Sequence, residues 1–444
     1  MKRINFFIVP VLILWALVVS SVRADAVGKT PYGAELKGNA DGSIPDWQGG
    51  QKNKKEFDVR LREDKSLYTI DASNIDQYRS ILPGALSALI ERYPETMRVP
   101  VYTSYRPAYY FDWIYDAISK NRDSAKLIKG GSAVIGTYPG IPFPDPKDGY
   151  EVLWNHMLSF RGVSFDVKSW EMVIQENRRS SVIKSRVKLS SEYYNKDRGK
   201  SKEDQIHSYY LSTVISPPKL SGSSLLVHER VNGSIIPRQA WGYLAGQRRV
   251  VRIPSIDYDA PMPRSEGIRF ADEVDIYIGS IDRYEWRLVG KKEMIIPYNN
   301  DVLYEALRVT EGPSEAVLTK FHMNPELLRY EKHRVWVIEG LLKEGKHHPY
   351  KKRILYLDED SWNAVLAENY SRNGDLWRVS TSYTKLYHTF PGIFKVVDTH
   401  HDLKDKAYYA QGALGGEDNG FVIGSEVLPK RGFKPSALRR LGRR

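Results

Sequence analysis

Cysteine is absent from the whole of this 444-residue chain. That absence excludes thiol nucleophiles, thiolate metal ligands, redox-active cysteine pairs and stabilising disulfides. The fold must therefore depend on a buried hydrophobic core, and a chain of this length can form one. Because no cysteine follows the apolar N-terminal run, the chain also lacks an acylation site for a lipoprotein anchor.

Sequence motifs of common enzymes are absent as well. The chain has no Gly-x-Ser-x-Gly turn, no His-Glu-x-x-His pair, no glycine-rich phosphate loop and no dinucleotide-binding fingerprint. We therefore expect no catalytic residue, no metal site and no cofactor. The alternative is a hydrolase acting on an apolar ester, which would need a serine or carboxylate site that no motif reveals.

Histidine is scarce, with ten residues in the chain. Each of the doublets His347-His348 and His400-His401 would point its two side chains to opposite faces of a strand, so neither chelates a metal alone. We interpret both doublets as surface turns. We interpret His156 and His333, which lie among aromatic residues, as buried, hydrogen-bonded histidines.

The N-terminus has the pattern of an export signal. Lys2-Arg3 precede the apolar run Ile4–Val19, and small residues follow it. We interpret residues 1–24 as a cleaved signal peptide, with a mature chain beginning at Asp25 or Val27; the alternative is an uncleaved membrane anchor. The mean hydropathy of −0.47 excludes an integral membrane protein, so we expect a soluble protein in the periplasm.

The charge balance is basic. The net charge is +12, and it is still +9 after removal of Lys2, Arg3 and Arg23 with the signal peptide. Outside the cytoplasm, a basic surface favours anionic lipid head groups or acidic proteins as partners. Export argues against nucleic acid as a partner.

Hydrophobic patterning divides the mature chain into a turn-rich segment (25–82), a helical region (83–162), a sheet region (163–430) and a basic tail (431–444). Helical periodicity predicts helices around residues 86–93, after Pro107 and over 148–160, with a further short helix at 268–277. The sheet region predicts about ten antiparallel strands. Its clearest part is a meander over residues 330–388, with Asn373-Gly374 as a hairpin turn. These patterns predict one large α+β domain.

Residue parity predicts two different faces for this sheet. In residues 376–388 one face carries Trp377, Val379, Thr381 and Tyr383, and the other carries polar residues such as Arg378. A large apolar face must be covered by helices or enclose an apolar ligand.

Several segments resemble an uncharacterised family of exported Gram-negative proteins that is described as a domain of unknown function and grouped with the outer-membrane lipoprotein-sorting (LolA/LolB-like) proteins. The resemblance extends in order from about residue 30 to the C-terminus. It is carried by residues 38–47 (GNADGSIPDW), 238–241 (RQAW), 246–250 (GQRRV), 288–293 (LVGKKE), 297–300 (PYNN), 333–337 (HRVWV), 356–362 (YLDEDSW) and 435–440 (PSALRR).

The resemblance implies a strongly curved antiparallel sheet, an incomplete barrel, with helices over its concave face and an apolar cavity for acyl chains. It also implies a periplasmic binding or carrier protein for a lipid, a lipoprotein or another hydrophobic compound. The implied partners are an inner-membrane exporter of the resistance-nodulation-division type or an outer-membrane acceptor. A structural role without a small ligand stays open beside the hydrolase.

Two sets of residues are candidate binding sites. For the wall of the ligand cavity, the aromatic strand residues are Trp241, Tyr243, Trp286, Trp336, Trp362 and Trp377. For docking to an anionic membrane surface, the residues of the basic tail are Arg431, Lys434, Arg439, Arg440, Arg443 and Arg444.

Overall fold

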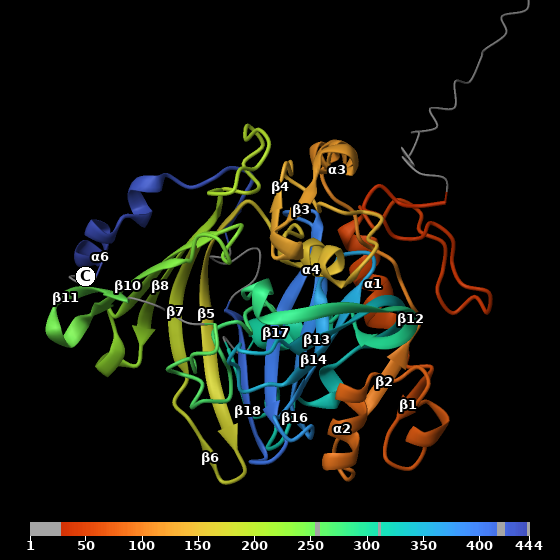
Figure 1. The fold of residues 1–444 in the computed structure, drawn as a ribbon. Coiled ribbons are helices and arrows are strands. Elements are labelled where there is room, and N and C mark those ends of the chain that lie inside the picture. The colour runs from red at the N-terminus through yellow and green to blue at the C-terminus, as the bar shows by residue number, and fades with distance from the viewer. Residues whose placement is uncertain (1–27, 254–257, 310–311, 415–421, 442–444) are drawn as a thin grey trace, which may run out of the picture.

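The computed structural model describes residues 28–253, 258–309, 312–414 and 422–441 (Figure 1). The predicted signal peptide and the last two arginines of the tail lie outside these ranges. None of the described helices combines the length and apolar character that a bilayer-spanning helix needs.

The described residues form six α-helices, and the sequence predicted three of them. They are α1 (Lys54–Glu63), α2 (Gly84–Arg92), α3 (Asp112–Ser124), α4 (Gly149–Met157), α5 (Asp301–Val309) and α6 (Pro435–Leu441). Helices α2, α3 and α4 match the predicted helical region. The N-cap residue Asp148 begins α4, since its carboxylate accepts the Glu151 backbone N–H at 2.9 Å.

Nineteen strands are present among the described residues. They are β1 (Tyr68–Ile70), β2 (Val99–Tyr102), β3 (Lys126–Ile128), β4 (Ala133–Ile135), β5 (Ser164–Gln175), β6 (Arg178–Arg179), β7 (Ile183–Ser191), β8 (Ile206–Ser216), β9 (Ser224–Arg230), β10 (Gln239–Leu244), β11 (Arg249–Ile253), β12 (Tyr284–Pro297), β13 (Tyr330–Leu342), β14 (Lys352–Asp358), β15 (Ala364–Tyr370), β16 (Leu376–Tyr387), β17 (Gly392–Asp402), β18 (Ala407–Leu414) and β19 (Val422–Gly424).

Seventeen of these strands form one large, open, strongly curved sheet (Figure 1). Its main ladder is antiparallel and runs β12-β13-β14-β15-β16-β17-β18-β5-β7-β8-β9-β10-β11. The short strand β2 adds a parallel pairing to β13. The predicted meander is confirmed as β13–β16, and the turn residue Gly374 has a φ of 90°, which glycine adopts without strain.

The structure contradicts the predicted helix at 268–277, which consists of turns. Its polar side chains are bound to the sheet instead of forming the outer face of a helix: Arg269 Nη1 donates to Gln411 Oε1 at 2.8 Å. Local periodicity could not show this, because the partners lie more than a hundred residues away in the chain.

Burial divides the sheet into two regions, which we call the filled half (β12–β18) and the wing (β8–β11). In β16, every residue from Arg378 to Tyr387 is buried, so both faces are covered. In β11, no residue is buried. Figure 1 shows the green strands of the wing leaving the main body, with the blue helix α6 lying on them.

Candidate functional site

The inner face of the filled half is polar, and residues 258–283 cover it. Arg378 Nη1 donates to the backbone carbonyl of Ile268 at 2.8 Å, and Asn369 Nδ2 donates to Glu273 Oε1 at 3.2 Å. The predicted polar face of β16 therefore exists but is not solvated. Charged side chains from residues 258–283 pair with it, which allows a polar sheet face to be buried.

The centre of this buried network is the ion pair of Arg353 and Asp272. Arg353 Nη2 donates to Asp272 Oδ2 at 2.7 Å and lies 2.9 Å from His348 Nε2. Burial alone would raise the pKa of Asp272, but Arg353 and His348 together outweigh it and lower that pKa to about 2. All three side chains are buried, so this part of the inner face is filled by the protein's own paired side chains.

A hydrolytic triad is not formed by the serine and histidine of this face. Ser380 Oγ lies 2.9 Å from His400 Nδ1, and Glu273 Oε1 lies 3.9 Å from the same nitrogen. A proton relay needs the serine and the carboxylate on opposite ring nitrogens. All three side chains are also buried. This geometry does not support nucleophilic catalysis.

The inner face of the wing is different. It is formed by apolar side chains, and the rest of the protein covers them only in part. Two cross-strand rows define this face: Leu225–Gly242–Val251 and Val227–Ala240–Ile253. Leu225, Val251 and Ile253 are partly exposed. Since a cross-strand row lies on one side of a sheet, these six residues share one apolar face, on which Val227, Ala240 and Gly242 are buried.

Charged residues lie at both ends of this apolar surface. At the tip of the wing, Leu244 pairs with Arg249; Leu244 is 41% exposed, and Arg249 is exposed as well. At the other end, Arg238 forms an ion pair with Glu229 at 3.2 Å. An amphipathic molecule could therefore place an apolar chain along the surface and an anionic group at Arg249.

The outer face of the wing is covered by the C-terminal segment. Phe433 and Leu438 are buried there in a small core with Tyr243, and Trp241 packs against it. The candidate cavity residues Trp241 and Tyr243 thus face the C-terminal segment, on the opposite side from the apolar inner face.

The other candidate cavity residues lie elsewhere in the sheet. The Trp336 and Trp362 rings stack at 5.8 Å, and Trp286 packs edge-on against Tyr277 at 5.1 Å. Trp377 lines a surface cleft of about 420 Å³. The structure therefore does not bring the six aromatic candidates together in one cavity.

The cleft at Trp377 lies where the hairpins of the filled half end. Its wall includes Arg372, Lys404 and Asp405. The Trp377 ring contacts the guanidinium of Arg378, whose Cζ lies 4.2 Å from the ring centroid. Mixed charges at a ring already in contact with a cation do not indicate a ligand class.

The described part of the basic tail is a docked segment. Arg431, Lys434, Arg439 and Arg440 are exposed, whereas the apolar residues between them pack on the wing. Arg443 and Arg444 lie outside the described residues. Helix α6 contacts β11, and this places a second basic group beside the tail.

This second group consists of Arg248, Arg249 and Arg252 at the tip and edge of the wing. All three side chains are exposed. Within the described ranges, neither these arginines nor the exposed cations of the tail form an ion pair with a carboxylate. We call these seven cations the basic rim: Arg248, Arg249, Arg252, Arg431, Lys434, Arg439 and Arg440.

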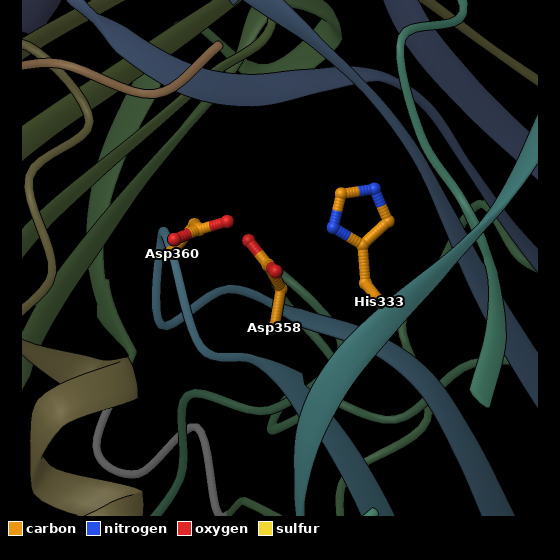
Figure 2. Close-up of side chains that lie close together, drawn as sticks. All are labelled: His333, Asp358 and Asp360. Atoms are coloured by element: carbon orange, nitrogen blue, oxygen red, sulfur yellow. The ribbon is translucent and has the colours of Figure 1, made fainter. Parts of the chain in front are cut away.

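A separate buried cluster lies at the turn between β14 and β15. Figure 2 shows His333, from β13, directed toward Asp358 and Asp360. One ligand atom from each residue lies within 4.8 Å of the others, and all three side chains are buried. The prediction that His333 is a buried, hydrogen-bonded histidine is confirmed, as its Nε2 lies 3.1 Å from Glu331 Oε2.

Both aspartates of this cluster are held in place. Arg106 Nε and Nη2 donate to the two carboxylate oxygens of Asp360 at 2.9 and 2.7 Å, and Tyr298 and Ser361 donate to Asp358 Oδ2 at 3.1 and 2.6 Å. Burial, and then the neighbouring Asp360 carboxylate, raise the pKa of Asp358. Burial opposes ionisation of Asp360 too, but Arg106, with His333 and Arg334, outweighs burial and lowers the pKa of Asp360.

The surface-turn interpretation of the histidine doublets is wrong for three of the four residues. His400 and His401 lie within β17 and are buried, and His348 is buried beside Arg353; only His347 is exposed. Two adjacent residues on a strand point to opposite faces of the sheet, so one of them is exposed if either face is in contact with solvent. Both faces of β17 are covered by protein, so both histidines are buried.

The sequence missed the cluster around His333 because this residue lies on β13, whereas Asp358 ends β14 and Asp360 lies in the turn that follows. The family resemblance could have pointed to the cluster, because two of the segments that carry it, 333–337 and 356–362, contain His333 and the two aspartates. The segment 38–47 lies beside β12 and β13: Asn39 Nδ2 donates to Glu293 Oε2 at 2.8 Å, and Lys332 Nζ donates to Asp41 Oδ2 at 2.9 Å.

Comparison with known proteins identifies the family. Residues 69–439 match the family described as "Protein of unknown function (DUF1329)". The uncharacterized protein PA3922 of Pseudomonas aeruginosa is 36% identical over 438 residues, covering 96% of this chain and 95% of that protein. This chain therefore belongs to the DUF1329 family, as its sequence segments predicted.

Solved structures show weaker likeness. A DUF1329 family protein from Desulfovibrio piger has a TM-score of 0.43 at 13% identity, covering 65% of this chain and 97% of its own. An outer membrane lipoprotein-sorting protein domain from Vibrio parahaemolyticus has a TM-score of 0.45 at 15% identity, with coverages of 66% and 98%. At such scores the likeness says nothing about ligands.

Proposed function

We propose that this protein binds the apolar chain of a lipid, lipoprotein or other hydrophobic compound on the inner face of the wing. The observation that supports this proposal is the difference in burial between the filled half and the wing. Both faces of β15–β17 are buried under protein, whereas Leu225, Val251 and Ile253 stay partly exposed on an apolar surface. Partly exposed apolar surface of this kind is typical of binding sites.

Burial of an acyl chain supplies enough free energy for this binding. Each methylene group removed from water contributes about 0.8 kcal/mol, so a chain of about a dozen methylenes contributes on the order of 10 kcal/mol. The exposed guanidinium of Arg249, at one end of the apolar surface, would contact an anionic head group.

The basic rim extends this proposal to a membrane. Its seven exposed cations dock the wing to an anionic lipid surface, each contributing about 1 kcal/mol at low ionic strength. We keep the signal peptide at residues 1–24, and hence a periplasmic location, as part of the proposal. An inner-membrane exporter or an outer-membrane acceptor would then supply or receive the ligand.

Mutation of the wing tests ligand binding. Leu244 and Val251 are changed to glutamate, and binding of a fluorescent fatty acid such as cis-parinaric acid is measured by titration. The matched control is Val289→Glu, because Val289 on β12 is 44% exposed and apolar but lies outside the wing. We expect at least tenfold weaker binding for both wing variants and unchanged binding for the control.

Equal binding by all three variants would contradict the proposed site. The melting temperatures are compared in parallel, and since Leu244 and Val289 are both more than 40% exposed, neither substitution should unfold the chain. Native mass spectrometry of protein purified from its own host separates a carrier from the hydrolase alternative. Co-purified acyl species support a carrier, whereas ligand-free protein that turns over model esters supports the enzyme.

A further inference from the structure

The cluster of His333, Asp358 and Asp360 has the chemistry of a metal site. We propose that these three side chains bind one divalent first-row transition-metal cation, with Zn²⁺ as the reference ion. One imidazole nitrogen and two carboxylates are donors that Zn²⁺ and its neighbours accept. The site is separate from the wing and does not depend on the function proposed for it.

The ring of His333 is oriented as metal-binding histidines are. Its Nε2 lies 3.1 Å from Glu331 Oε2, and its Nδ1 edge faces the two aspartates (Figure 2). When Nε2–H donates to Glu331, Nδ1 has a free lone pair that points into the cluster. Such carboxylate–histidine pairs fix the tautomer of metal ligands and increase their basicity.

Glu331 is itself held rigidly. Its Oε1 accepts bonds from the Arg329 guanidinium and from Asn299 Nδ2, at 2.5 and 2.9 Å, and its Oε2 accepts the backbone N–H of Tyr105 at 2.8 Å. The acceptor that orients His333 therefore cannot turn away from the ring.

A second, independent observation points to a cation. Asp358 Oδ1 is buried and has no hydrogen-bond partner among the described residues, while Oδ2 of the same carboxylate accepts from Tyr298 and Ser361. A buried carboxylate oxygen without a partner is unfavourable. A cation among Asp358, Asp360 and His333 Nδ1 would give this oxygen its missing partner.

Arg106 is compatible with metal binding at Asp360. It donates one N–H to each carboxylate oxygen, and each oxygen has a second lone pair. With Arg106 neutralising Asp360, a divalent cation would meet one further negative charge, from Asp358. Arg106 and Ser361 thus position the two aspartates and are not themselves ligands.

The experiment uses the full mature chain, stripped with a chelator and titrated with Zn²⁺ by calorimetry. We expect one equivalent per chain and a higher melting temperature with Zn²⁺. Visible absorption with Co²⁺ as the probe should show bands typical of a low-symmetry site. A chain that takes up neither ion at one equivalent would overturn the proposal.

Variants assign the ligands. His333→Gln and Asp358→Asn should each weaken Zn²⁺ binding at least tenfold, and Glu331→Gln should weaken it about 10–100-fold while one equivalent still binds. The control His347→Gln removes an exposed histidine and should bind as the unaltered chain does. Equal weakening by the control, or full affinity in His333→Gln, would contradict the assignment. If His333→Gln does not fold, the Co²⁺ spectrum of Glu331→Gln decides: an unchanged spectrum and affinity contradict the site.

Discussion

The filled half and the wing belong to one continuous sheet, yet they bury their surfaces by different means. In the filled half, residues 258–283 bring charged partners to a polar inner face, and α2 with neighbouring segments covers the outer face. In the wing, α6 covers the outer face, and the apolar inner face stays partly exposed. One strand ladder therefore combines a closed structural region with an open surface.

This difference follows from the cost of burying charge. An ion pair inside a protein is tolerated when each charge is paired and hydrogen-bonded, and the loss of one partner is strongly destabilising. The filled half depends on such pairs. A ligand that displaced residues 258–283 would leave the charged side chains of the sheet without their partners. On the inner face of the wing, the two cross-strand rows consist of apolar residues: Leu225, Val227, Ala240, Val251 and Ile253 beside Gly242. A ligand can therefore lie on these rows without disturbing an ion pair.

The largest effect is expected from the central ion pair of the filled half. Arg353→Ala leaves Asp272 buried without its cation and should lower the free energy of unfolding by about 3–5 kcal/mol. Urea denaturation followed by tryptophan fluorescence measures the change. The control is Arg287→Ala, whose side chain is 70% exposed in its pair with Glu339 and should cost less than about 1 kcal/mol. Similar losses for both would remove the distinction.

A smaller, local effect is expected in the wing. Leu438 lies on α6 and is buried in the small core between this helix and the wing, so Leu438→Ala should cost about 2–3 kcal/mol. Hydrogen exchange should speed up in α6 and β8–β11 and stay unchanged in β15–β17. Leu341→Ala, at a residue 45% exposed on β13, is the control and should leave both regions unchanged. Uniform acceleration across the sheet would mean that the two regions unfold together.

The pH dependence of stability sharpens the description of the filled half. Burial, followed by nearby His322, lowers the pKa of His401 to about 3, and neither ring nitrogen has a hydrogen-bond partner among the described residues. The unfolded chain takes up a proton near pH 6.5, which folded His401 does not accept. Stability is therefore present above pH 6.5 and is lost as the pH falls toward 3.

His401→Phe keeps the stack on Tyr408 and removes this titration. Between pH 7 and pH 5 we expect the variant to lose about 1–2 kcal/mol less stability than the unaltered chain. Chemical denaturation at each pH measures this difference. An identical pH profile for the two chains would show that His401 takes up a proton as readily in the folded chain as in the unfolded one.

The smallest effect per residue is expected at the basic rim. Arg252→Gln, Arg439→Gln and Arg440→Gln together should weaken binding to anionic vesicles by about 1 kcal/mol per residue at low salt, with little effect on neutral vesicles. The control replaces three exposed lysines at and near α1, outside the basic rim, with glutamine: Lys52, Lys55 and Lys65. Charge substitution is preferable to truncation, because truncation would remove buried Phe433 and Leu438. Equal weakening by the control set would indicate non-specific charge attraction.

Local patterns predicted the local structure well. The apolar spacing of Leu86, Leu89 and Ile90 is that of α2, and Asn373-Gly374 is the turn between β15 and β16. The charged helix α1 was missed, since only Phe57 and Leu61 of its ten residues are buried. Two apolar residues among charges do not distinguish a helix from a turn-rich segment.

Long-range pairing was beyond the sequence patterns. Trp241 and Tyr243, both candidates for the cavity wall, do lie on one face of β10, but no pattern showed that Phe433 and Leu438 would cover that face. The same limit applies to His333 on β13, because Asp358 and Asp360 come from the end of β14 and the turn after it. The surface that we propose as the binding site could not be predicted without knowing which face of the sheet the chain itself covers.

Photo-crosslinking with a diazirine fatty acid tests the central contrast most directly. Purified chain is loaded with the probe, irradiated and digested, and the labelled peptides are identified by mass spectrometry. We predict labels on residues of β9, β10 and β11 at the inner face, above all Leu225, Leu244 and Val251, with competition by unlabelled fatty acid. Competed labels concentrated in residues 258–283 or on β14–β18 would show that the filled half opens to hold the ligand, and would contradict the account.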